Sequence, residues 1–569
     1  MASIVSPMAN AQQSAQELFD RHRSTLDQAI ATIHSREFWS PYPESPSPRV
    51  YGETAAAEGQ AAYEAYLGNQ FPIDQPATVG WVGDERSPYG PELGVQYPAA
   101  DIDALLPAMH GAMPAWRDAG AQARAGVCLE ILDRLNKASF TMAGAVMHTS
   151  GQAFVMAFQA GGPQAQDRGL EAVAYAYEEM IRQPRSAVWE KPQGRRPPVR
   201  MEKTFHVVPR GIALVIACNT FPTWNSYPGF FASLVTGNPV LVKPHPRATL
   251  PLAITVQTAR AVLAEAGFDP NLVCLAAEQT GGTLAADLAT RPEIRIIDFT
   301  GSTSFGEWLE ANARQAQVYT EKAGVNAVVV DSTDDFRGMC ANLAFSLSLY
   351  SGQMCTTPQN IFVPRAGITG DGEHKSFADV VDGIGTALDA LLGEDAKAVE
   401  LLGAIANDSV RERLDAAASQ GTVAVPSRTV RHPKFPDAVV RTPVIVRLDV
   451  DDEKAYTSEC FGPVAFAIAT DDTAQSIDVF RRTVSERGAL TASVYSTDEK
   501  VLDATEDAAI ESGVALSCNL TGGVYVNQSA AYSDFHGTGA NPAANAALTD
   551  GAYVAGRFRI VQSRRHLPA

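Results

Sequence analysis

Cys355 stands in a segment where a thiol could act as a nucleophile. The segment reads SGQMCTT (351–357) and places glycine close to the cysteine. A thiolate attacks carbonyl carbons, whereas most cysteines in a protein core are inert apolar side chains. By itself the segment fits both interpretations.

An acidic residue upstream could supply the base that such chemistry needs. Glu321 lies in YTEKAG (319–324), where a carboxylate is followed closely by glycine. A carboxylate in this position can activate water, and it can equally be a solvated surface charge. This segment alone decides nothing.

A glycine-rich turn is the third chemical feature. The segment FTGSTSFG (299–306) stands where a strand is expected to end and a helix to begin. Glycines such as Gly301 and Gly306 let the backbone approach a ligand, and the N–H groups at a helix start, here near Ser302, bind phosphate. Many such turns bind nothing, so this feature is also weak alone.

The sequence between these features predicts the scaffold that brings them together. Residues 101–177 have a mainly helical pattern, and from Gly211 onward apolar strands alternate with helices. The predicted strands are 212–217, 239–242, 272–276 and 294–299, with a helix at 250–266. Such alternation implies parallel pairing, a Rossmann-like sheet and an α/β fold.

An N-terminal leader precedes this scaffold and is predicted to cover residues 1–75. Residues 14–34 have an amphipathic helical pattern, which Ser14 and Glu17 would open as a capping box. We expect this leader to pack on the main body as an appendage.

A hairpin arm is predicted at 188–208, where prolines and Gly194 form the centre of the segment. The chain near 558–561 is strand-like as well. An isolated hairpin is marginal in water, so we expect the arm to pair with another subunit in a homodimer or homotetramer.

The composition argues against several classes of partner. The 569 residues are 46% apolar and 19% charged, and the formal net charge is −19. So acidic a surface repels nucleic acid and anionic lipid, and no apolar run is long enough to span a bilayer. The seven cysteines lack disulfide or metal-site spacing and the N-terminus lacks a signal peptide pattern, so we expect no metal and a cytoplasmic location.

Taken together and in this order, the motifs resemble the aldehyde dehydrogenase superfamily. The resemblance runs from about Ser87 to Asn527, and Glu321 and Cys355 are 34 positions apart (355 − 321), as is usual in that family. The matching motifs are VKP (242–244), FTGSTSFG (299–306), Glu321, Cys355 and ECFGP (459–463). The resemblance implies a nucleotide-binding domain of 76–187 and 209–325, a catalytic domain of 326–526, and oligomerisation elements at 188–208 and 540–569.

The resemblance also implies a chemistry, the NAD(P)-dependent oxidation of an aldehyde to a carboxylic acid. Cys355 would attack the aldehyde to form a thiohemiacetal and then a thioester, and Glu321 would activate the water that hydrolyses it. It assigns Lys243 to the adenosine ribose and Glu459 to the nicotinamide ribose, with Phe461 in the same motif as a further cofactor-binding residue.

The family's oxyanion asparagine has no direct counterpart here. Aligned on Phe221 and Pro222, its position falls on Thr220, with Asn219 one place earlier. We favour Asn219 reaching the site through a one-residue shift, because an amide is the better-matched donor. The alternatives are that the Thr220 hydroxyl substitutes, or that Asn219 merely caps the turn.

The choice between the two nicotinamide cofactors depends on a second departure. Three residues after Lys243, where the NAD-specific pattern has a glutamate, this sequence has Pro246, flanked by His245 and Arg247. Loss of the carboxylate admits NADP, and the basic neighbours could pair with its phosphate, which slightly favours NADP over NAD. The alternative is that Arg247 is an ordinary surface charge.

Within the superfamily, NTFPTWN (219–225), KPHP (243–246) and the long leader are similar to the phenylacetate-degradation branch. Relatives in that branch carry a fused hydratase domain, which we expect to be absent here. The branch implies a semialdehyde from aromatic-ring cleavage, either free or carried on CoA.

Two other functions are weighed against this one. In a CoA-acylating dehydrogenase CoA takes the acyl group, but such enzymes usually lack the base that Glu321 provides. The other alternative is a catalytically silent structural relative, and the intact set of Cys355, Glu321 and Glu459 argues against it.

Overall fold

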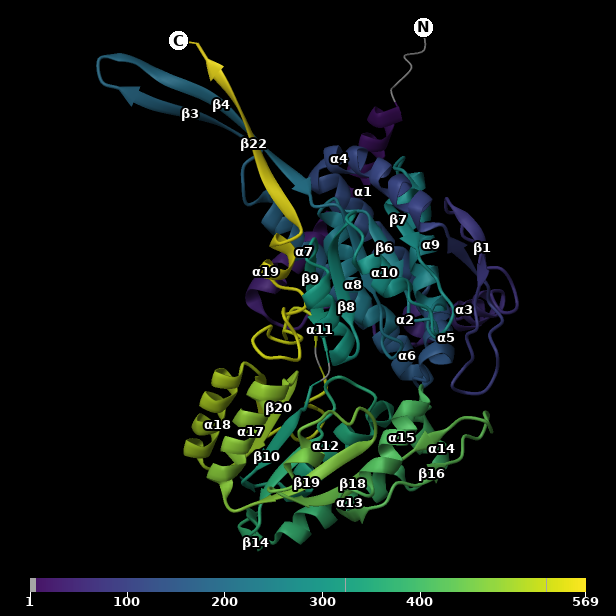
Figure 1. Ribbon diagram of the computed structural model, residues 1–569, viewed down its shortest axis with the longest axis vertical. Helices are drawn as coiled ribbons and strands as arrows, with labels where there is room; N and C mark the ends of the chain where they lie inside the picture. Colours follow the sequence, from purple (N-terminus) through teal and green to yellow (C-terminus); the bar gives the residue numbers. More distant parts are fainter. Residues whose placement is uncertain (1–6, 323, 529, 569) are drawn as a thin grey trace.

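Two sheets of short, apolar, mostly parallel strands organise the chain. The computed structural model describes residues 7–322, 324–528 and 530–568. Figure 1 shows one sheet in the upper body, the other in the lower body, and a long arm projecting from the upper body. The α/β fold and the Rossmann-like sheet that the sequence predicts are confirmed.

The upper sheet has five strands in the order β7-β6-β5-β8-β9, and every pair is parallel. Its strands are β5 (Ile212–Ile216), β6 (Val240–Lys243), β7 (Val273–Leu275), β8 (Ile294–Thr300) and β9 (Gln317–Glu321). The predicted strands differ from these by a residue or two at their ends. β5 and β6 are buried along their whole length, as expected of parallel strands covered on both faces.

Helices cover this sheet and form a thick layer beside it. The crossover helices are α8 (Pro222–Val235), α9 (Leu250–Glu265), α10 (Leu284–Ala289) and α11 (Thr303–Asn312), with a 3-10 turn η1 (Pro270–Leu272). The helical layer is α4 (Ile102–Lys137), α5 (Ser139–Ser150), α6 (Phe154–Gly161) and α7 (Pro163–Ile181). This layer corresponds to the segment 101–177 that the sequence predicts as helical.

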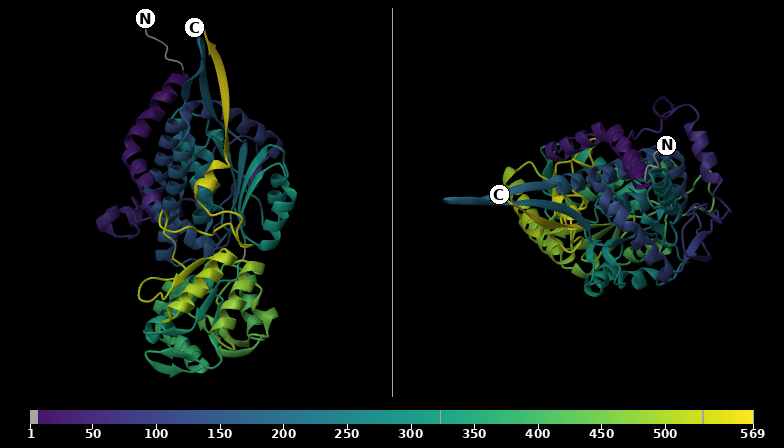
Figure 2. Two further views of the ribbon diagram at one scale, coloured as in Figure 1. Left: turned by 90° about the vertical axis from the view of Figure 1, so that its left-hand side faces the viewer. Right: turned by 90° about the horizontal axis from the view of Figure 1, so that it is seen from above.

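The leader begins with α1 (Pro7–Ser35), which lies along the outside of the helical layer (Figure 2, left). Because the helix already begins at Pro7, Ser14 lies inside it and the predicted capping box is wrong. Gly126 of α4 faces α1, where an added Cβ would lie 2.5 Å from the backbone nitrogen of Phe19. Glycine is therefore needed for this close helix approach. The leader continues through α2 (Pro48–Tyr51) and α3 (Ala55–Glu64). The antiparallel strand pair β1 (Thr78–Val82) and β2 (Tyr97–Ala100) follows it.

The lower sheet has seven strands in the order β15-β18-β19-β12-β10-β20-β21. Only the edge strand β15 pairs in the antiparallel sense. The strands are β10 (Ala327–Val330), β12 (Asn360–Pro364), β15 (Thr422–Val425), β18 (Val444–Asp449), β19 (Val464–Thr470), β20 (Thr491–Tyr495) and β21 (Ala515–Cys518).

Helices and small sheets complete the lower body. The helices are α12 (Phe336–Ser348), η2 (Leu349–Gly352), α13 (Phe377–Leu392), α14 (Asp395–Leu402), α15 (Asp408–Ala417), α16 (Glu453–Tyr456), α17 (Thr473–Arg487) and α18 (Glu499–Ser512). The small sheets consist of β11 (Ser332–Thr333), β13 (Ile368–Gly370) and β14 (Glu373–Lys375), and of β16 (Thr429–Val430) with β17 (Val440–Arg441).

The arm is a three-stranded antiparallel ribbon that extends away from the body (Figure 2, right). It consists of the hairpin β3 (Ser186–Gln193) and β4 (Arg196–Pro209), with β22 (Phe558–Leu567) along the other edge of β4. The predicted strand near 558–561 is thus longer than the sequence indicates, because pairing with β4 extends it to Leu567.

Between β21 and β22 the chain returns from the lower body to the upper body. This return segment (519–550) has little regular structure, but Ala544 forms an isolated bridge with Glu321 of β9. The short helix α19 (Gly551–Ala555) then leads into β22. The first part of the range 540–569 therefore lies against the body, and only β22 belongs to the arm. No helix in the described part of the chain is long and apolar enough to cross a membrane.

Candidate active site

Cys355 follows a sharp turn that the sequence holds in an uncommon backbone conformation. Tyr350 and Ser351 have φ values of 53° and 51°, in the left-handed region that non-glycine residues rarely adopt. Gly352 continues the turn at φ 64°, where an added Cβ would lie 2.4 Å from the carbonyl oxygen of Gly462, just before β19. The turn is anchored because the Ser351 hydroxyl donates to the Leu402 carbonyl at 3.1 Å.

A second contact fixes the nucleophile from the other side. Asn326, directly before β10, donates from its amide to the carbonyl oxygens of Cys355 at 2.8 Å and Thr357 at 2.9 Å. Its own amide oxygen accepts from the backbone of Leu490 and Thr491. The loop is therefore held by buried hydrogen bonds on both sides.

Glu321 ends β9 and turns its carboxylate into the space beside Cys355. It is 1% exposed, and Oε2 accepts a hydrogen bond from Asn225 Nδ2 at 2.9 Å. Burial opposes ionisation, but the charge of His536 and hydrogen bonds to the carboxylate outweigh it and lower the pKa of Glu321. The group is thus held as a carboxylate, which is the form that can take a proton from water.

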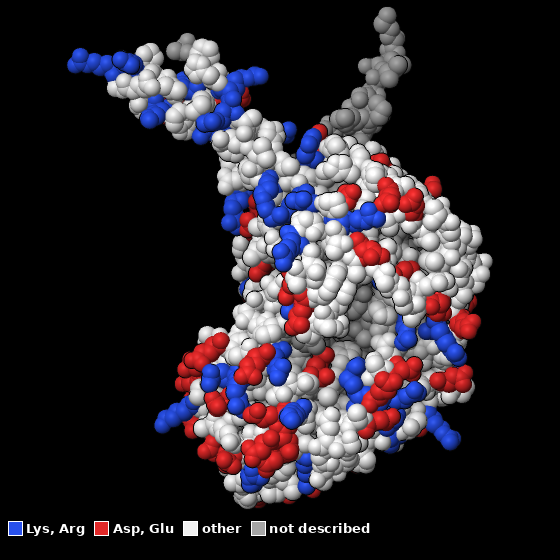
Figure 3. Space-filling model, viewed as in Figure 1, with Lys and Arg blue, Asp and Glu red and all other residues white. Residues whose placement is uncertain are grey.

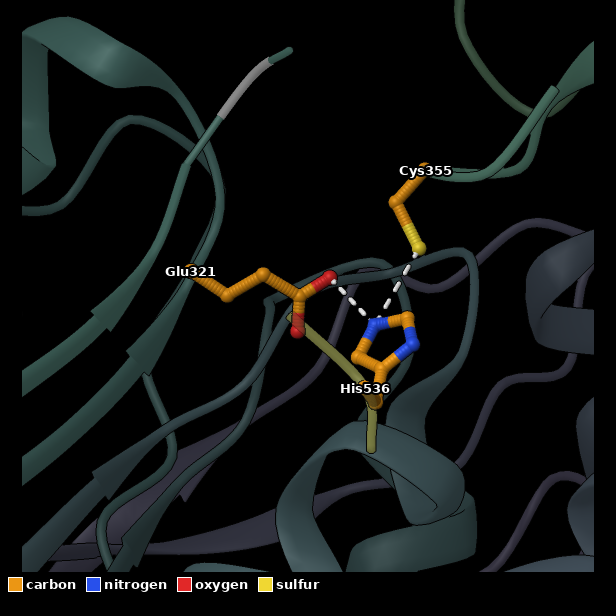
Figure 4. A group of neighbouring side chains, drawn as sticks. All are labelled: Glu321, Cys355 and His536. Carbon is orange, nitrogen blue, oxygen red and sulfur yellow. Dashed lines mark hydrogen bonds and ion pairs between the residues drawn. The ribbon is translucent and has the colours of Figure 1, made fainter. Parts of the chain in front are cut away.

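His536, on the return segment, joins these two residues. Its Nε2 lies 3.6 Å from Cys355 Sγ and 3.1 Å from Glu321 Oε1. Figure 4 shows the imidazole between the thiol and the carboxylate, with both contacts meeting at one nitrogen. The ring is 4% exposed and packs edge-on against Trp224 at a centroid distance of 4.7 Å.

The thiol does not ionise easily in these surroundings. The Cys355 residue is partly exposed, but its thiol is closely surrounded by protein atoms. Burial of the thiol raises its pKa well above the usual value, and the negative charge of Glu321 raises it further. Nucleophilic attack therefore requires a base in contact with the sulfur.

Asn219 presents a free amide donor, whereas Thr220 does not. Asn219 is 5% exposed, its Oδ1 accepts from Asn407 Nδ2 at 3.0 Å, and within the described residues its Nδ2 has no protein partner. The Thr220 hydroxyl donates to Cys218 Sγ at 3.8 Å. A buried amide with a free N–H₂ fits an oxyanion donor better than this hydroxyl.

Asn407 is oriented in turn by Arg247. Asn407 occupies the N-cap position of α15, but its side chain makes no hydrogen bond to that helix. Instead its Oδ1 accepts from Arg247 Nη1 at 3.0 Å. A hydrogen-bonded chain thus runs from Arg247 in the upper body through Asn407 in the lower body to Asn219.

The glycine turn lies beside Glu321. Gly301 N donates to the Glu321 carbonyl at 3.1 Å, so the turn and the acid share one edge of the sheet. Ser302 is the N-cap of α11 without a side-chain hydrogen bond to it, which leaves the helix start open to an anion. Gly306 allows α11 to approach β9, since an added Cβ would lie 2.6 Å from Lys322 Cγ. These features fit a dinucleotide phosphate.

Lys243, at the end of β6, is buried and forms an ion pair with Glu278, which follows β7. Glu278 also accepts from Leu284 N at 2.9 Å through Oε2. Burial, then the charges of Lys243 and Arg247, lowers the pKa of His245 to about 4. His245 is therefore neutral near pH 7.

Glu459 and Phe461 line a pocket on the other side of the nucleophile. Gly324, Gly352 and Met354 line the same pocket. Burial raises the pKa of Glu459 to about 7, and its Oε1 accepts from Gly324 N at 3.4 Å. A half-buried carboxyl group in a pocket next to Cys355 fits the hydroxyl groups of a ribose.

A family model described as the aldehyde dehydrogenase family matches residues 95–538. The chain belongs to the aldehyde dehydrogenase family. A solved relative, described as an NAD-dependent aldehyde dehydrogenase from Burkholderia multivorans, is 60% identical with a TM-score of 0.96, covering 97% of this chain and 99% of its own. The predicted superfamily is confirmed.

The following relatives are less similar to this chain than the Burkholderia multivorans protein. A 1-pyrroline-5-carboxylate dehydrogenase from Thermus with bound NAD has a TM-score of 0.70 at 20% identity, covering 93% of this chain and 99% of that one, and shares the fold. The 3,4-dehydroadipyl-CoA semialdehyde dehydrogenase of Aromatoleum evansii is 26% identical over 51% of this chain. The match spans 57% of that relative's length, and only 30% of the length of a 1-pyrroline-5-carboxylate dehydrogenase of Bacillus subtilis.

The aldehyde dehydrogenase site thus contains residues that the sequence interpretation missed. His536 lies in SDFHGTG (533–539), a glycine-containing segment whose histidine could have drawn attention, and Asn225 ends the NTFPTWN motif. Asn407 and Glu278 carry no signal in the sequence. Glu321, Cys355 and His536 also offer ligand atoms within 4.8 Å of one another, a group that could hold a metal ion, so the expectation of no metal stays a prediction.

Proposed function

We propose that this protein oxidises an aldehyde to a carboxylic acid with NAD(P) as the acceptor, through a thiohemiacetal and a thioester on Cys355. The observation that carries the proposal is the placement of a thiol and an ionised carboxylate within 4.8 Å of one another at a buried site. Cys355 supplies the nucleophile, and Glu321 supplies the base that activates water for hydrolysis.

The residues around the nucleophile have distinct roles in this reaction. Attack of Cys355 Sγ on the carbonyl carbon moves negative charge to the oxygen, and the Nδ2 of Asn219, which has no protein partner among the described residues, would stabilise that charge. The bound nicotinamide supplies the hydride acceptor. Glu321 then takes a proton from the water that attacks the thioester, and Asn225 holds the carboxylate for this step through the contact at Oε2.

The cofactor residues in this proposal lie at two strand ends and on one loop. The phosphates would lie at Gly301, Ser302 and Gly306, the adenosine ribose at Lys243, and the nicotinamide ribose at Glu459 with Phe461 beside it. A preference for NADP stays a prediction, and it has lost support. His245 is neutral near pH 7, and Arg247 already donates to Asn407.

The substrate is proposed to be a semialdehyde from the breakdown of aromatic compounds, free or linked to CoA. The similarity to the phenylacetate-degradation branch supports this assignment, as does a relative named for a CoA-linked semialdehyde at 26% identity. Steady-state rates with a panel of aldehydes that includes CoA-linked semialdehydes test it directly.

The order of acylation and hydrolysis tests the roles of the two residues. Cys355→Ala should abolish oxidation, because no thiohemiacetal forms. Glu321→Gln should give a burst of NAD(P)H of about one equivalent per active site and then a slow steady rate, because hydrolysis alone loses its base. Rapid-mixing absorbance at 340 nm measures both phases.

Mass spectrometry of the quenched Glu321→Gln protein provides the control. The acyl group should lie on Cys355 and on none of the other six cysteines. An unmodified Cys355 in protein that has turned over aldehyde would rule out the covalent mechanism. The two alternative functions give different results: a CoA-acylating enzyme would turn over only with added CoA, and a silent relative would give no burst.

A further inference from the structure

His536 contacts both reacting residues through a single nitrogen. Nε2 is 3.6 Å from Cys355 Sγ and 3.1 Å from Glu321 Oε1 (Figure 4). In a serine protease triad the acid and the nucleophile contact different ring nitrogens, and the acid only orients the histidine. Here the thiol and the carboxylate share one proton-binding atom.

We propose that His536 is the base that takes the proton from the Cys355 thiol, which leaves Glu321 free to activate water. This inference rests on the covalent mechanism proposed above and adds a third catalytic residue to it. His536 contacts the reacting sulfur of Cys355. Its ring is only 4% exposed and packs perpendicular to the Trp224 ring, so it is held in this contact.

Glu321 is less suited to accept this proton. Both of its carboxylate oxygens are already engaged, Oε2 by Asn225 at 2.9 Å and Oε1 by His536. Once His536 carries the proton, its positive charge and the hydrogen bonds from His536, Cys355 and Asn225 lower the pKa of Glu321, so the proton stays on the imidazole and does not pass to the carboxylate. His536 offers a ring nitrogen in contact with the sulfur, and the imidazolium that forms on proton transfer lies 3.1 Å from the Glu321 carboxylate, so opposite charges are paired.

The proton balance closes over one cycle. The cycle starts from neutral His536 with the ring proton on Nδ1, so that Nε2 is free to accept. The S–H bond breaks as the Nε2–H bond forms, and the thiolate adds to the carbonyl carbon, whose π electrons move to the oxygen. Hydride leaves to the oxidised nicotinamide dinucleotide and the thioester results. Water then attacks, giving one proton to Glu321. The expelled thiolate recovers its proton from the His536 imidazolium, and Glu321 releases its proton to solvent.

Several charged or titratable groups surround the pair and affect its titration. Glu321 lies on β9 and Glu459 on the loop before β19, and both raise the pKa of the Cys355 thiol, as does Cys218 after β5. Arg168 of α7 lies over the Trp224 ring at 5.1 Å. The arrangement is therefore net acidic at the sulfur, which favours a proton carrier that becomes positively charged.

The test is the rate at which iodoacetamide alkylates Cys355, followed by mass spectrometry as a function of pH without aldehyde. Only the thiolate reacts, so this rate reports proton transfer from sulfur independently of turnover. For His536→Gln we expect a rate at about pH 6 that is at least tenfold lower than in the unaltered protein. The two rates should converge at high pH. Glu321→Gln should not lower the rate tenfold, because it removes a negative charge that raises the pKa of the thiol.

Controls separate this outcome from misfolding and from failure of the covalent mechanism. His374→Gln changes an exposed histidine of β14 and should leave the alkylation profile unchanged. His536→Asn provides a second variant, and the thermal midpoint of each variant should match that of the unaltered protein. Acylation of Cys355 by aldehyde, measured separately, tests the covalent mechanism itself.

The inference is overturned if Glu321→Gln removes the reactivity at about pH 6 while folded His536→Gln and His536→Asn keep it. In that case Glu321 activates the thiol. It is equally overturned if none of the three variants changes the profile, since the thiol would then ionise without either group.

Discussion

The free amide of Asn219 is held in place by two hydrogen bonds that begin outside the site. Arg247 donates to Asn407, and Asn407 donates to Asn219 Oδ1, which leaves Nδ2 as the buried end of the chain. Leaving a buried donor without a partner costs free energy unless a ligand pairs with it. This arrangement is the one expected if Asn219 Nδ2 donates to a negatively charged substrate oxygen during the reaction.

Asn219→Ala should lower turnover by about a hundredfold, because the lost donor stabilises the oxyanion by about 2.7 kcal/mol. The affinity for the cofactor should change little. Steady-state kcat and KM, with the cofactor and the aldehyde varied in turn, measure both effects. Thr220→Val is the matched control at the adjacent position, and if it alone is damaging, the oxyanion role belongs to Thr220.

The ends of β6 and β7 carry the residues that we propose to face the adenosine side of the cofactor. Lys243 ends β6, and Glu278, three residues after β7, pairs with it. If Lys243 binds the adenosine ribose, as we propose, the Glu278 carboxylate would lie near the same ribose. It would supply the negative charge that Pro246 cannot provide, although it comes from a different strand.

Glu278→Gln should shift the ratio of kcat/KM for NADP to that for NAD toward NADP by about tenfold, equivalent to about 1.4 kcal/mol. The reason is that the carboxylate repels a 2′-phosphate and the amide does not. Asp287→Asn, an exposed carboxylate of α10, serves as the control. If the ratio is the same in all three proteins, Glu278 does not face the ribose and selectivity lies elsewhere.

The elements differ in how far the sequence predicts them. The strands of the upper sheet are found to within a residue or two because each is a short apolar run bounded by turns, and Glu321 and Cys355 follow from motif and spacing. The helix start at Pro7 was missed because Ser14 and Glu17 imitate a cap while the residues before them continue the helix.

The rest of the site depends on contacts between distant parts of the chain. His536 lies 181 positions from Cys355, on a return segment with no regular pattern, and Asn407 lies 188 positions from Asn219. Asn407 also occupies the N-cap position of α15, where asparagine is common, so the sequence would suggest that its side chain caps this helix. Only the packing of the two bodies shows that its side chain is used elsewhere.

At the scale of the whole molecule the arm differs from the body in charge and in exposed apolar surface. Its range, 186–209 and 558–567, has eight lysines and arginines against two glutamates, in a chain of net charge −19. Figure 3 shows these basic side chains gathered along the arm. Val188 and Val561 are 59% and 50% exposed there. Both features suit contact with the acidic, partly apolar surface of a second copy.

We therefore predict a homodimer or homotetramer at micromolar concentration, measured by light scattering. Replacing Val188 and Val561 together by glutamate should shift the population toward the monomer, because charge is then buried at the contact. High salt should weaken the assembly further, since the attraction is partly electrostatic. Val79→Glu, at an exposed position of β1, is the control, and an unaltered protein that stays monomeric would contradict the prediction.

The placement of His536 on the return segment has a consequence for the order of events during folding. Domains form as units and N-terminal ones form first during synthesis, so the five-stranded sheet with Glu321 and the turn carrying Cys355 are available before residue 536 has been made. Until the return segment docks, the thiol lacks the base assigned to it and stays protonated. In the growing chain Cys355 is therefore a protonated, unactivated thiol. It becomes a nucleophile only in the final step of folding. On refolding at about pH 6, helix and strand content should recover before Cys355 reaches the alkylation rate of the folded protein.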